Sequence, residues 1–275
     1  NLPQVFRVDD FIDARSSTSL RCALSMSYFT ERLKELNPGL QVNRSAYHRY
    51  MDYIAYPSPE GEKFASEKAP WRRSFIEFEK KNVRPVRLMA SLFVKPEAIT
   101  DQDAMMRSLY WIAADMQNVE LDLSFYDIFE YEELVGVWKT VNARMYVCNA
   151  AAPLNGGLMP RCAVPLLRNI LESADAAIEK GTPAADLRFG HDTHLIRLLA
   201  LMQIEGCSNQ EVDMEKFHLA WQDYRVSPMG ANLQLIFYRD KKNDILVKFL
   251  LYECEVTLPV KSKMIPYYSW IEVET

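Results

Sequence analysis

The sequence contains no long apolar run and no basic tract, and each absence excludes a class of protein. Its longest apolar stretch, around Leu195 to Met202, is interrupted by Arg197, so no segment reaches the roughly 20 apolar residues of a membrane-spanning helix. Lysine and arginine are not clustered and the net charge is −5, so we expect no nucleic-acid partner. With 275 residues, 49% of them hydrophobic, the composition predicts one large globular domain or a core with a substantial insertion.

Cysteine is sparse and never occurs as a C-x-x-C pair, so we expect no structural zinc site. The five cysteines are Cys22, Cys148, Cys162, Cys207 and Cys254. The odd count leaves at least one thiol unpaired; a Cys148–Cys162 disulfide is open, but buried free thiols are favoured. No signal-peptide pattern occurs at the start, where Asn1 to Asp10 is typical of folded protein, and this leaves the compartment open.

The first 40 residues predict a strand, a turn and a helix. Residues Val5 to Ala14 alternate as in a strand, and Ser16, Ser17 and Thr18 then offer oxygens that can cap a helix. Apolar residues recur behind them at helical spacing, namely Ala23, Met26, Phe29, Leu33 and Leu36. The helix is expected to stop at Asn37-Pro38-Gly39. This arrangement places Arg21 in the first turn of the helix.

Residues 41–152 differ in character and predict a mostly helical insertion, a cap over the core. Residues 101–118 and 131–149 have helical patterns, and five prolines interrupt the first half. The Pro/Gly-rich stretch 153–160 is expected to be the linker back to the core. The sequence therefore predicts a core of residues 1–40 and 153–275 around an insertion of residues 41–152.

The second part of the core alternates helices and strands. The expected elements are a helix at 164–180 closed by Gly181, a strand at 185–190, a buried helix at 195–204, and a hairpin of residues 233–238 and 245–253. The hairpin is expected at the edge of the sheet. This alternation predicts an α/β fold with a mainly parallel sheet flanked by helices.

Two strand ends carry residues that could bind and cleave a phosphate ester. Arg21 lies at a helix N-terminus, where free N–H groups and the helix dipole favour an anion and a guanidinium adds bidentate recognition. Gly190-His191-Asp192-Thr193 follows the other strand; His191 offers an N–H, and Asp192, when protonated, can give a proton to a leaving oxygen. Each signal alone also fits an ordinary role: Arg21 as a surface arginine, Asp192 as a helix cap and His191 as a core histidine.

Taken together and in order, these segments resemble the histidine phosphatase superfamily, specifically its acid phosphatase and phytase branch. The run from Arg15 to Phe29 resembles the strand-to-helix segment that carries a phosphate-binding arginine, and Gly190 to Thr193 resembles the distal His-Asp motif. Residues 225–238 resemble the loop and strand that follow that motif. The resemblance implies a phosphoglycerate-mutase-like α/β core with a mostly helical cap.

The resemblance also implies the chemistry. Arg21 and His191 would hold the phosphoryl oxygens, Asp192 would protonate the leaving alcohol, and Arg15 would be structural. A histidine would attack phosphorus to give a phosphohistidine that water hydrolyses, with no metal and no cofactor. The substrate would be a phosphorylated small molecule, including inositol phosphates, and the location periplasmic or secreted. His194, Met229 and Asn232 are further candidates for the substrate pocket.

One family motif is missing from these 275 residues. The Arg-His-Gly-x-Arg segment that carries the nucleophile lies upstream of the Arg21 segment in the family, and none of the four histidines here, His48, His191, His194 and His218, lies in such a motif. We expect that segment to lie upstream of Asn1, and we expect His48 and His218 to be structural or, for His48, pocket-lining.

Two alternatives remain open at this stage. One is a catalytically inactive phosphate- or inositol-phosphate-binding module, which the missing motif favours. The other is a metal-dependent phosphohydrolase using His191, Asp192 and His194, for which further ligands are lacking. Asp192 favours a phytase-like enzyme, because multiple inositol polyphosphate phosphatases carry Glu in a His-Ala-Glu motif. Cys22 and the loop from Met229 to Asn232 are instead closer to the multiple inositol polyphosphate phosphatases, so the sequence leaves the substrate open. It also leaves the oligomeric state open.

Overall fold

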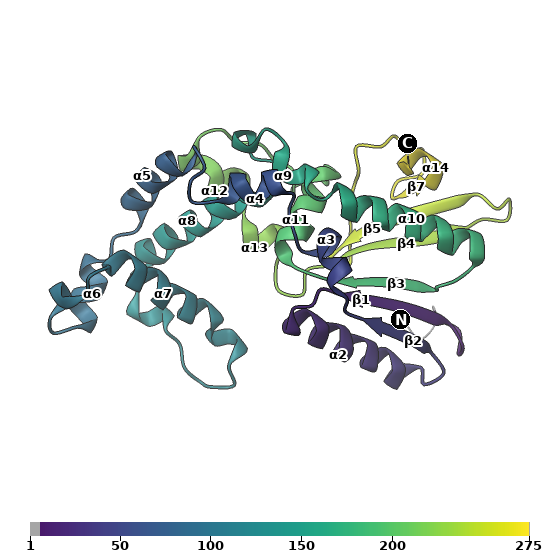
Figure 1. The fold of residues 1–275 in the computed structure, drawn as a ribbon, viewed down its shortest axis with the longest axis horizontal. Coiled ribbons are helices and arrows are strands. Elements are labelled where there is room, and N and C mark those ends of the chain that lie inside the picture. The colour runs from purple at the N-terminus through teal and green to yellow at the C-terminus, as the bar shows by residue number, and fades with distance from the viewer. Residues whose placement is uncertain (1–5, 275) are drawn as a thin grey trace.

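The computed structural model describes residues 6–274, and its centre is a parallel sheet of three strands in the order β2-β1-β3. Strand β1 (Phe11–Ser16) pairs with β2 (Gln41–Ser45) on one side and with β3 (Ala185–Phe189) on the other. Figure 1 shows these strands side by side, with helix α2 (Leu20–Leu36) on one face. The expected first strand is confirmed in part: it begins at residue 11 rather than in the preceding residues, and Val5 lies outside the described residues.

Strand β1 is the central strand because it pairs on both sides, and after the exposed Phe11 its side chains alternate between buried and half-buried positions. Ile12 and Ala14 are fully buried, and Leu33 of α2 and Leu40 pack against Ile12. The predicted capping by Ser16, Ser17 and Thr18 is wrong, because the residue that caps α2 is Ser19, without a side-chain hydrogen bond. Ser16 and Ser17 are instead buried at the end of the strand.

Residues 41–45 belong to the core sheet, whereas the sequence pattern placed the start of the insertion at residue 41. They form β2, which pairs in parallel with β1 from Gln41 to Ser45. The short helix α3 (Met51–Ile54), preceded by a 3-10 turn at His48–Tyr50, then packs on α10 (Val164–Lys180). The helical lobe therefore begins after α3.

The lobe consists of five helices that Figure 1 shows to one side of the sheets. They are α4 (Pro59–Ala65), α5 (Arg72–Asn82), α6 (Val86–Leu92), α7 (Gln102–Asp115) and α8 (Tyr131–Asn149). The helices expected at 101–118 and 131–149 are confirmed, the first of them ending in a 3-10 turn at Met116–Asn118. The lobe has an apolar core of its own, in which Leu88, Met106 and Val137 are fully buried. It is therefore a packed helical unit.

Residues 153–160 form a packed corner rather than an exposed linker. They contain a 3-10 turn (Pro153–Asn155) and most of α9 (Leu158–Arg161), with Met159 fully buried. The chain reverses at Gly156 and Gly157, both with positive φ, where glycine avoids the strain of a side chain.

The expected helix at 164–180 is confirmed as α10, which ends at Gly181 with φ of 71°. Helix α11 (Asp192–Leu201) begins three residues earlier than expected, because His191 occupies its N-cap position. Ile196, Leu198 and Leu199 are buried, so α11 runs through the interior as its apolar sequence predicts.

The predicted hairpin is confirmed but forms a separate antiparallel sheet. Strand β4 (Leu233–Arg239) pairs with β5 (Ile245–Leu251), which also pairs with β6 (Cys254–Glu255) and β7 (Tyr267–Ser269). Three short helices complete the chain, α12 (Phe217–Ala220), α13 (Asp223–Val226) and α14 (Trp270–Glu274), with a 3-10 turn at Met214–Lys216.

Strands β3 and β4 each have one unpaired edge. Within residues 6–274, β3 pairs only with β1 and β4 only with β5. Helix α10 contacts both sheets. Its residues Asn169 and Ser173 accept hydrogen bonds from Arg188 of β3, and its residues Leu171 and Ile178 pack against the antiparallel sheet. The same helix therefore spans the two sheets, as Figure 1 also shows.

The cysteines are free thiols, so the disulfide left open between Cys148 and Cys162 is not formed. Four of them are buried and Cys254 is exposed. Among the described residues, no helix combines the length and the hydropathy that a membrane span requires.

Candidate active site

The carboxyl ends of β1 and β3 lie next to each other, and both lead into helices that start at the same edge of the sheet. The backbone N–H of Ser17, just after β1, donates to the carbonyl of Phe189 at the end of β3, with 3.0 Å between the atoms. Helix α2 begins at Leu20 and α11 at Asp192. In open α/β sheets ligands bind at this edge, where helix N-termini also favour anions.

Arg21 and His191 meet at this edge although 170 residues separate them in the sequence. Nη2 of Arg21 is 3.0 Å from Nδ1 of His191, and Oγ of Ser17 is 3.2 Å from Nε2 of the same ring. The Asp192 carboxylate follows directly, is exposed, and accepts a hydrogen bond from the backbone N–H of Thr193 at 2.8 Å. Two of the predicted residues are thus in contact and the third is adjacent to them.

The turn that presents His191 is fixed by close packing around Gly190. A Cβ at this position would lie 2.6 Å from Cγ2 of Ile54, so α3 leaves no room for a side chain. The thiol of Cys22 donates to the Gly190 carbonyl at 3.1 Å, and the N–H of Thr18 donates to the sulfur of Met51 at 3.3 Å. Helices α2 and α3 therefore hold both turns of the site.

The electrostatics of the site favour a neutral His191 and an available guanidinium. Burial lowers the pKa of His191, and the nearby Arg21 lowers it further, while Asp192 opposes the shift. Arg21 is exposed and has no carboxylate within ion-pair distance among the described residues. Its charge is therefore available to an anion from solvent.

Arg15 has a different environment from Arg21. Its guanidinium is 2.6 Å from a carboxylate oxygen of Asp13 and 3.6 Å from one of Asp186, and Arg188 contacts the same Asp186. Arg188 is strongly buried, and burial lowers its pKa in spite of Asp186. This network lies across β1 and β3 and holds the two strands together.

The three further pocket candidates do not join Arg21 and His191. His194 is buried, with Nδ1 at 3.3 Å from Nη1 of Arg197, and Arg197 donates to Oδ1 of Asn149 at 2.7 Å. Met229 is exposed, and the amide of Asn232 donates to the Gly230 carbonyl at 3.1 Å. Among the described residues none of these side chains forms a hydrogen bond with Arg21 or His191, and His194 is buried rather than exposed in an open pocket.

The burial of His194 predicts a loss of stability in acid. Burial is the main cause that lowers its pKa to about 3 from 6.5, and the Arg197 charge adds to it. Nε2 of His194 is buried without a hydrogen-bond partner among the described residues, and the Tyr56 backbone only partly opposes the lowering of the pKa. Below pH 6.5 the unfolded chain binds a proton at this residue that the folded chain refuses until about pH 3, so stability falls as the pH drops through that window.

We expect protonation of this residue in the unfolded chain to lower the free energy of unfolding by a few kcal/mol between pH 6.5 and 3, at roughly 1.4 kcal/mol per pKa unit. The measurement is urea unfolding at a series of pH values. His194→Gln should flatten the dependence in this window, whereas the control His48→Gln, at an exposed position, should leave it unchanged. An equal slope in His194→Gln and the parent chain would show that this burial does not control acid stability.

The rings of the two remaining histidines contact other aromatic side chains. His48 is exposed beside the Tyr56 ring, and His218 packs edge-on against Trp138 in the helical lobe. In the part of the chain that the structure describes, no three His, Cys, Asp or Glu side chains are arranged to hold a metal ion. A metal centre from His191, Asp192 and His194 would need His194 to leave its buried contact with Arg197.

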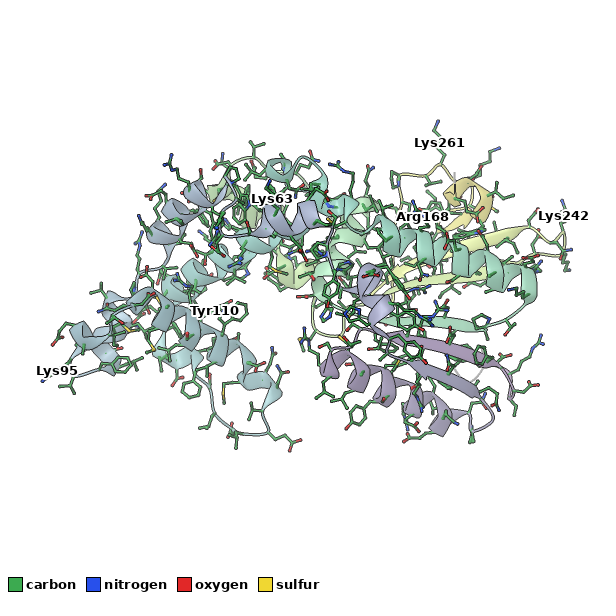
Figure 2. All side chains as sticks on the ribbon, viewed as in Figure 1. Lys63, Lys95, Tyr110, Arg168, Lys242 and Lys261 are labelled. Carbon is green, nitrogen blue, oxygen red and sulfur yellow. The ribbon has the colours of Figure 1, made fainter. Side chains whose placement is uncertain are left out.

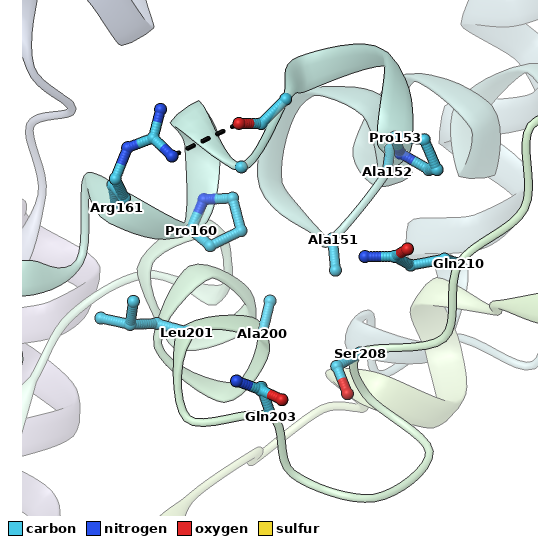
Figure 3. Close-up of a pocket in the computed structure, with 12 residues that line it drawn as sticks. Ala151, Ala152, Pro153, Pro160, Arg161, Ala200, Leu201, Gln203, Ser208 and Gln210 are labelled. Carbon is cyan, nitrogen blue, oxygen red and sulfur yellow. Dashed lines mark hydrogen bonds between the residues drawn. The ribbon is translucent and has the colours of Figure 1, made fainter.

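Other features of the surface do not add to this site. A cavity of about 420 Å³ lies between α9 and the end of α11, lined by Pro160, Leu201, Gln203 and neighbours (Figure 3), and shares no residue with it. Basic side chains are spread over the molecule: Lys63, Lys95, Arg168, Lys242 and Lys261 project from separate regions (Figure 2). The charges labelled there form no single basic patch.

Sequence patterns missed Ser17, Cys22 and Gly190 as structural members of the site. Ser17 was interpreted only as a cap, because a hydroxyl group at a helix start is typical of one. Gly190 was predicted only as part of the motif with His191, and its close approach to Ile54 depends on the position of α3. These roles arise from packing between distant segments.

The comparisons with solved structures match nearly the whole chain. The multiple inositol polyphosphate phosphatase of Bifidobacterium longum, in its apo form, aligns with a TM-score of 0.75 and 17% identity over 99% of this chain and 74% of that chain. The same phosphatase in complex with inositol hexasulfate aligns with a TM-score of 0.72 and 18% identity, over 97% of this chain and 72% of that chain. A phytase from D. castellii aligns at 0.68 with 16% identity, over 98% of this chain and 58% of the phytase. No family model and no curated protein matches the sequence.

These matches establish the fold. The parallel sheet, its flanking helices and the small antiparallel sheet form the histidine phosphatase fold that the chain shares with the matched inositol polyphosphate phosphatase and phytase structures. The α/β class expected from the sequence is confirmed. At identities of 16–18% the likeness concerns the fold, and chemistry has to be argued from the site.

Proposed function

We propose that this chain provides the phosphate-binding site and the general acid of a histidine-type phosphomonoesterase. The observation that carries the proposal is the contact between Arg21 and His191 at the carboxyl edge of the sheet, with Nη2 and Nδ1 3.0 Å apart and no carboxylate within ion-pair distance of the guanidinium in residues 6–274. Arg21 and His191 would hold two phosphoryl oxygens, and Asp192 would protonate the leaving alcohol. The likeness of the fold to inositol polyphosphate phosphatases and to a phytase supports this proposal.

The proposed reaction has two displacements. A histidine attacks phosphorus while Asp192 gives its proton to the departing oxygen, and water then hydrolyses the phosphohistidine. Among the described residues no second histidine forms a hydrogen bond with Arg21 or His191; His194 bonds to Arg197, the His48 ring lies beside Tyr56 and the His218 ring against Trp138. We therefore propose that the nucleophile comes from a segment upstream of Asn1.

The unpaired edges of β3 and β4 support this location. A strand placed between them would pair with both, join the two sheets under α10 and bring its end to the edge where Arg21 and His191 lie. A strand that paired in parallel with β3 would have its own carboxyl end beside His191, which is where the proposed reaction needs a nucleophile.

Hydrogen exchange tests this arrangement. Alternate amides of β3 and β4 face the unpaired edges, and we expect them to exchange quickly in the 275-residue chain. In a longer product of the gene with an upstream strand, the same amides should exchange on the order of 100-fold more slowly. The amides of β1, which is paired on both sides, are the internal control. Unchanged exchange at β3 and β4 would contradict a strand at this place.

Calorimetric titration tests the anion site itself. The Bifidobacterium longum phosphatase has been crystallised with inositol hexasulfate and with phosphate, so both are suitable probes. We expect saturable, salt-sensitive binding of each, because charge-assisted hydrogen bonds dominate the contact. Asp9→Asn, an exposed carboxylate away from the site, should bind like the parent chain. Absence of saturable binding at low salt would rule out the proposed phosphate site.

A phosphate- or inositol-phosphate-binding module without catalysis is the second candidate. The observation that favours it is that no second histidine of the described residues forms a hydrogen bond with Arg21 or His191. The two proposals differ in turnover: an aryl phosphate would be bound but not hydrolysed by a binding module, even in the longest product of the gene.

The proposed substrates are phosphomonoesters of small alcohols, inositol phosphates among them, and the proposed location is the periplasm or the cell exterior. Both rest on the likeness to phytases and inositol polyphosphate phosphatases. Cell fractionation with an antibody against the protein tests the location, which cytoplasmic recovery would contradict.

A further inference from the structure

The Arg21 contact determines which nitrogen of His191 carries the proton. A guanidinium has only N–H donors and no acceptor, so the nitrogen 3.0 Å from Nη2 must present its lone pair. That nitrogen is Nδ1. A neutral imidazole has one N–H and one lone pair, so its proton lies on Nε2, which faces Oγ of Ser17 at 3.2 Å.

Oγ of Ser17 is placed to accept a hydrogen bond from the Nε2–H group of His191. The residue is fully buried, and its N–H bonds to the Phe189 carbonyl at 3.0 Å, immediately before the turn that carries His191. The neighbouring hydroxyl of Ser16 donates to the Ser17 carbonyl at 2.7 Å and forms no hydrogen bond with the His191 ring. Oγ of Ser17 has no other partner within hydrogen-bond distance among the described residues.

We infer that Ser17 is a positioning residue that, together with Arg21, holds His191 as the neutral tautomer with its proton on Nε2. The charged groups that face the ring are Arg21 from α2 and Asp192 from its own helix, with His194 one turn further along α11. The other packed element, α3, contributes the apolar Ile54 and Met51 near the two turns. Ser17 is therefore the only uncharged hydrogen-bond partner of the ring in the described residues.

This arrangement has a consequence for ligand binding, which rests on the proposed function. The lone pair of Nδ1 and the guanidinium of Arg21 lie together, so an incoming phosphate displaces their mutual hydrogen bond. His191 donates to a phosphoryl oxygen from Nδ1 only after this nitrogen takes up a proton, supplied by solvent or by the phosphate monoanion. Ser17 keeps the ring oriented through this change, because Nε2 carries its proton in both states.

The test uses the whole chain labelled with ¹⁵N-histidine, whose four imidazoles give few signals. Nitrogen shifts and couplings to the ring protons show which nitrogen is protonated, and His191→Asn assigns the signals. We expect protonated Nε2 and unprotonated Nδ1 in the parent chain at neutral pH. This measurement needs no variant and no phosphate, so it is independent of the proposed function; protonation at Nδ1 would overturn the inference.

The role of Ser17 is tested by Ser17→Ala with Ser16→Ala as the matched control, since both serines are fully buried and adjacent. In Ser17→Ala the Nε2 proton should exchange with water at least about tenfold faster, because its acceptor is gone. Ser16→Ala should keep the parent exchange rate. Equal exchange in Ser17→Ala and the parent, or an equal acceleration in both variants, would overturn the role of Ser17. A chain that shows the expected signals but binds no phosphate would instead refute only the proposed function.

Discussion

Asp192→Asn should lower kcat for an alkyl phosphate by about 10²–10⁴-fold in the full gene product that carries the nucleophile, the range typical of a lost general acid. An alkoxide is a poor leaving group, so the bond to phosphorus breaks only as a proton arrives. The Asp192 carboxylate is exposed next to His191 and bonds only to the Thr193 N–H among the described residues, so one of its oxygens is free to face the substrate. An amide has the same shape and cannot supply the proton.

The leaving group distinguishes this role from a structural one. An aryl phosphate departs as a weakly basic phenoxide and needs little protonation, so the loss in Asp192→Asn should be much smaller for this substrate. KM should change little for both, because the amide leaves the phosphate contacts in place. Asp9→Asn is the control carboxylate. Equal losses on both substrates would contradict a general acid at this position and would indicate damage to the site as a whole.

Local patterns predicted those elements whose ends are marked in the sequence. Helix α10 was predicted at its observed bounds because a glycine, Gly181, follows its apolar periodicity. In the structure this glycine has a positive φ, as a helix-ending glycine commonly does. The sequence also predicted the order in which Arg21 and the His191 segment follow strands, which is why two distant motifs could be assigned to one edge. Such signals need only a few neighbouring residues.

Pairing between distant segments was beyond these patterns. Strand β2 has a largely polar sequence, Gln41 to Ser45, without a buried alternation, and it is a strand because β1 pairs with it. The separation of the hairpin into its own sheet depends on the unpaired edges of β3 and β4, which no local pattern encodes. The family resemblance assigned His194 to the pocket, but in α11 this residue is buried against Arg197, three residues further along the same face.

Arg21→Gln should lower kcat/KM of the same full gene product by about 10²–10³-fold, as expected when a charged donor to the developing phosphoryl charge is removed. The guanidinium lies at the start of α2, and its only contact through the side chain among the described residues is His191. Arg21→Lys should show a smaller loss, because it keeps the charge but not the bidentate geometry. Arg32→Gln on the same helix, which breaks only an exposed ion pair with Glu35, should retain activity.

The pH dependence of the loss identifies its electrostatic origin. Arg21 is one of the groups that lower the pKa of His191, so its removal should raise that pKa and allow the ring to be protonated at a higher pH. A protonated His191 supplies part of the missing positive charge, and the ratio of parent to Arg21→Gln activity should therefore shrink as the pH falls. Rate profiles of the parent and the variant, with Arg32→Gln alongside, measure this ratio. A ratio that stays constant with pH would mean that Arg21 and His191 do not share the phosphate charge, and would contradict the site as it is proposed.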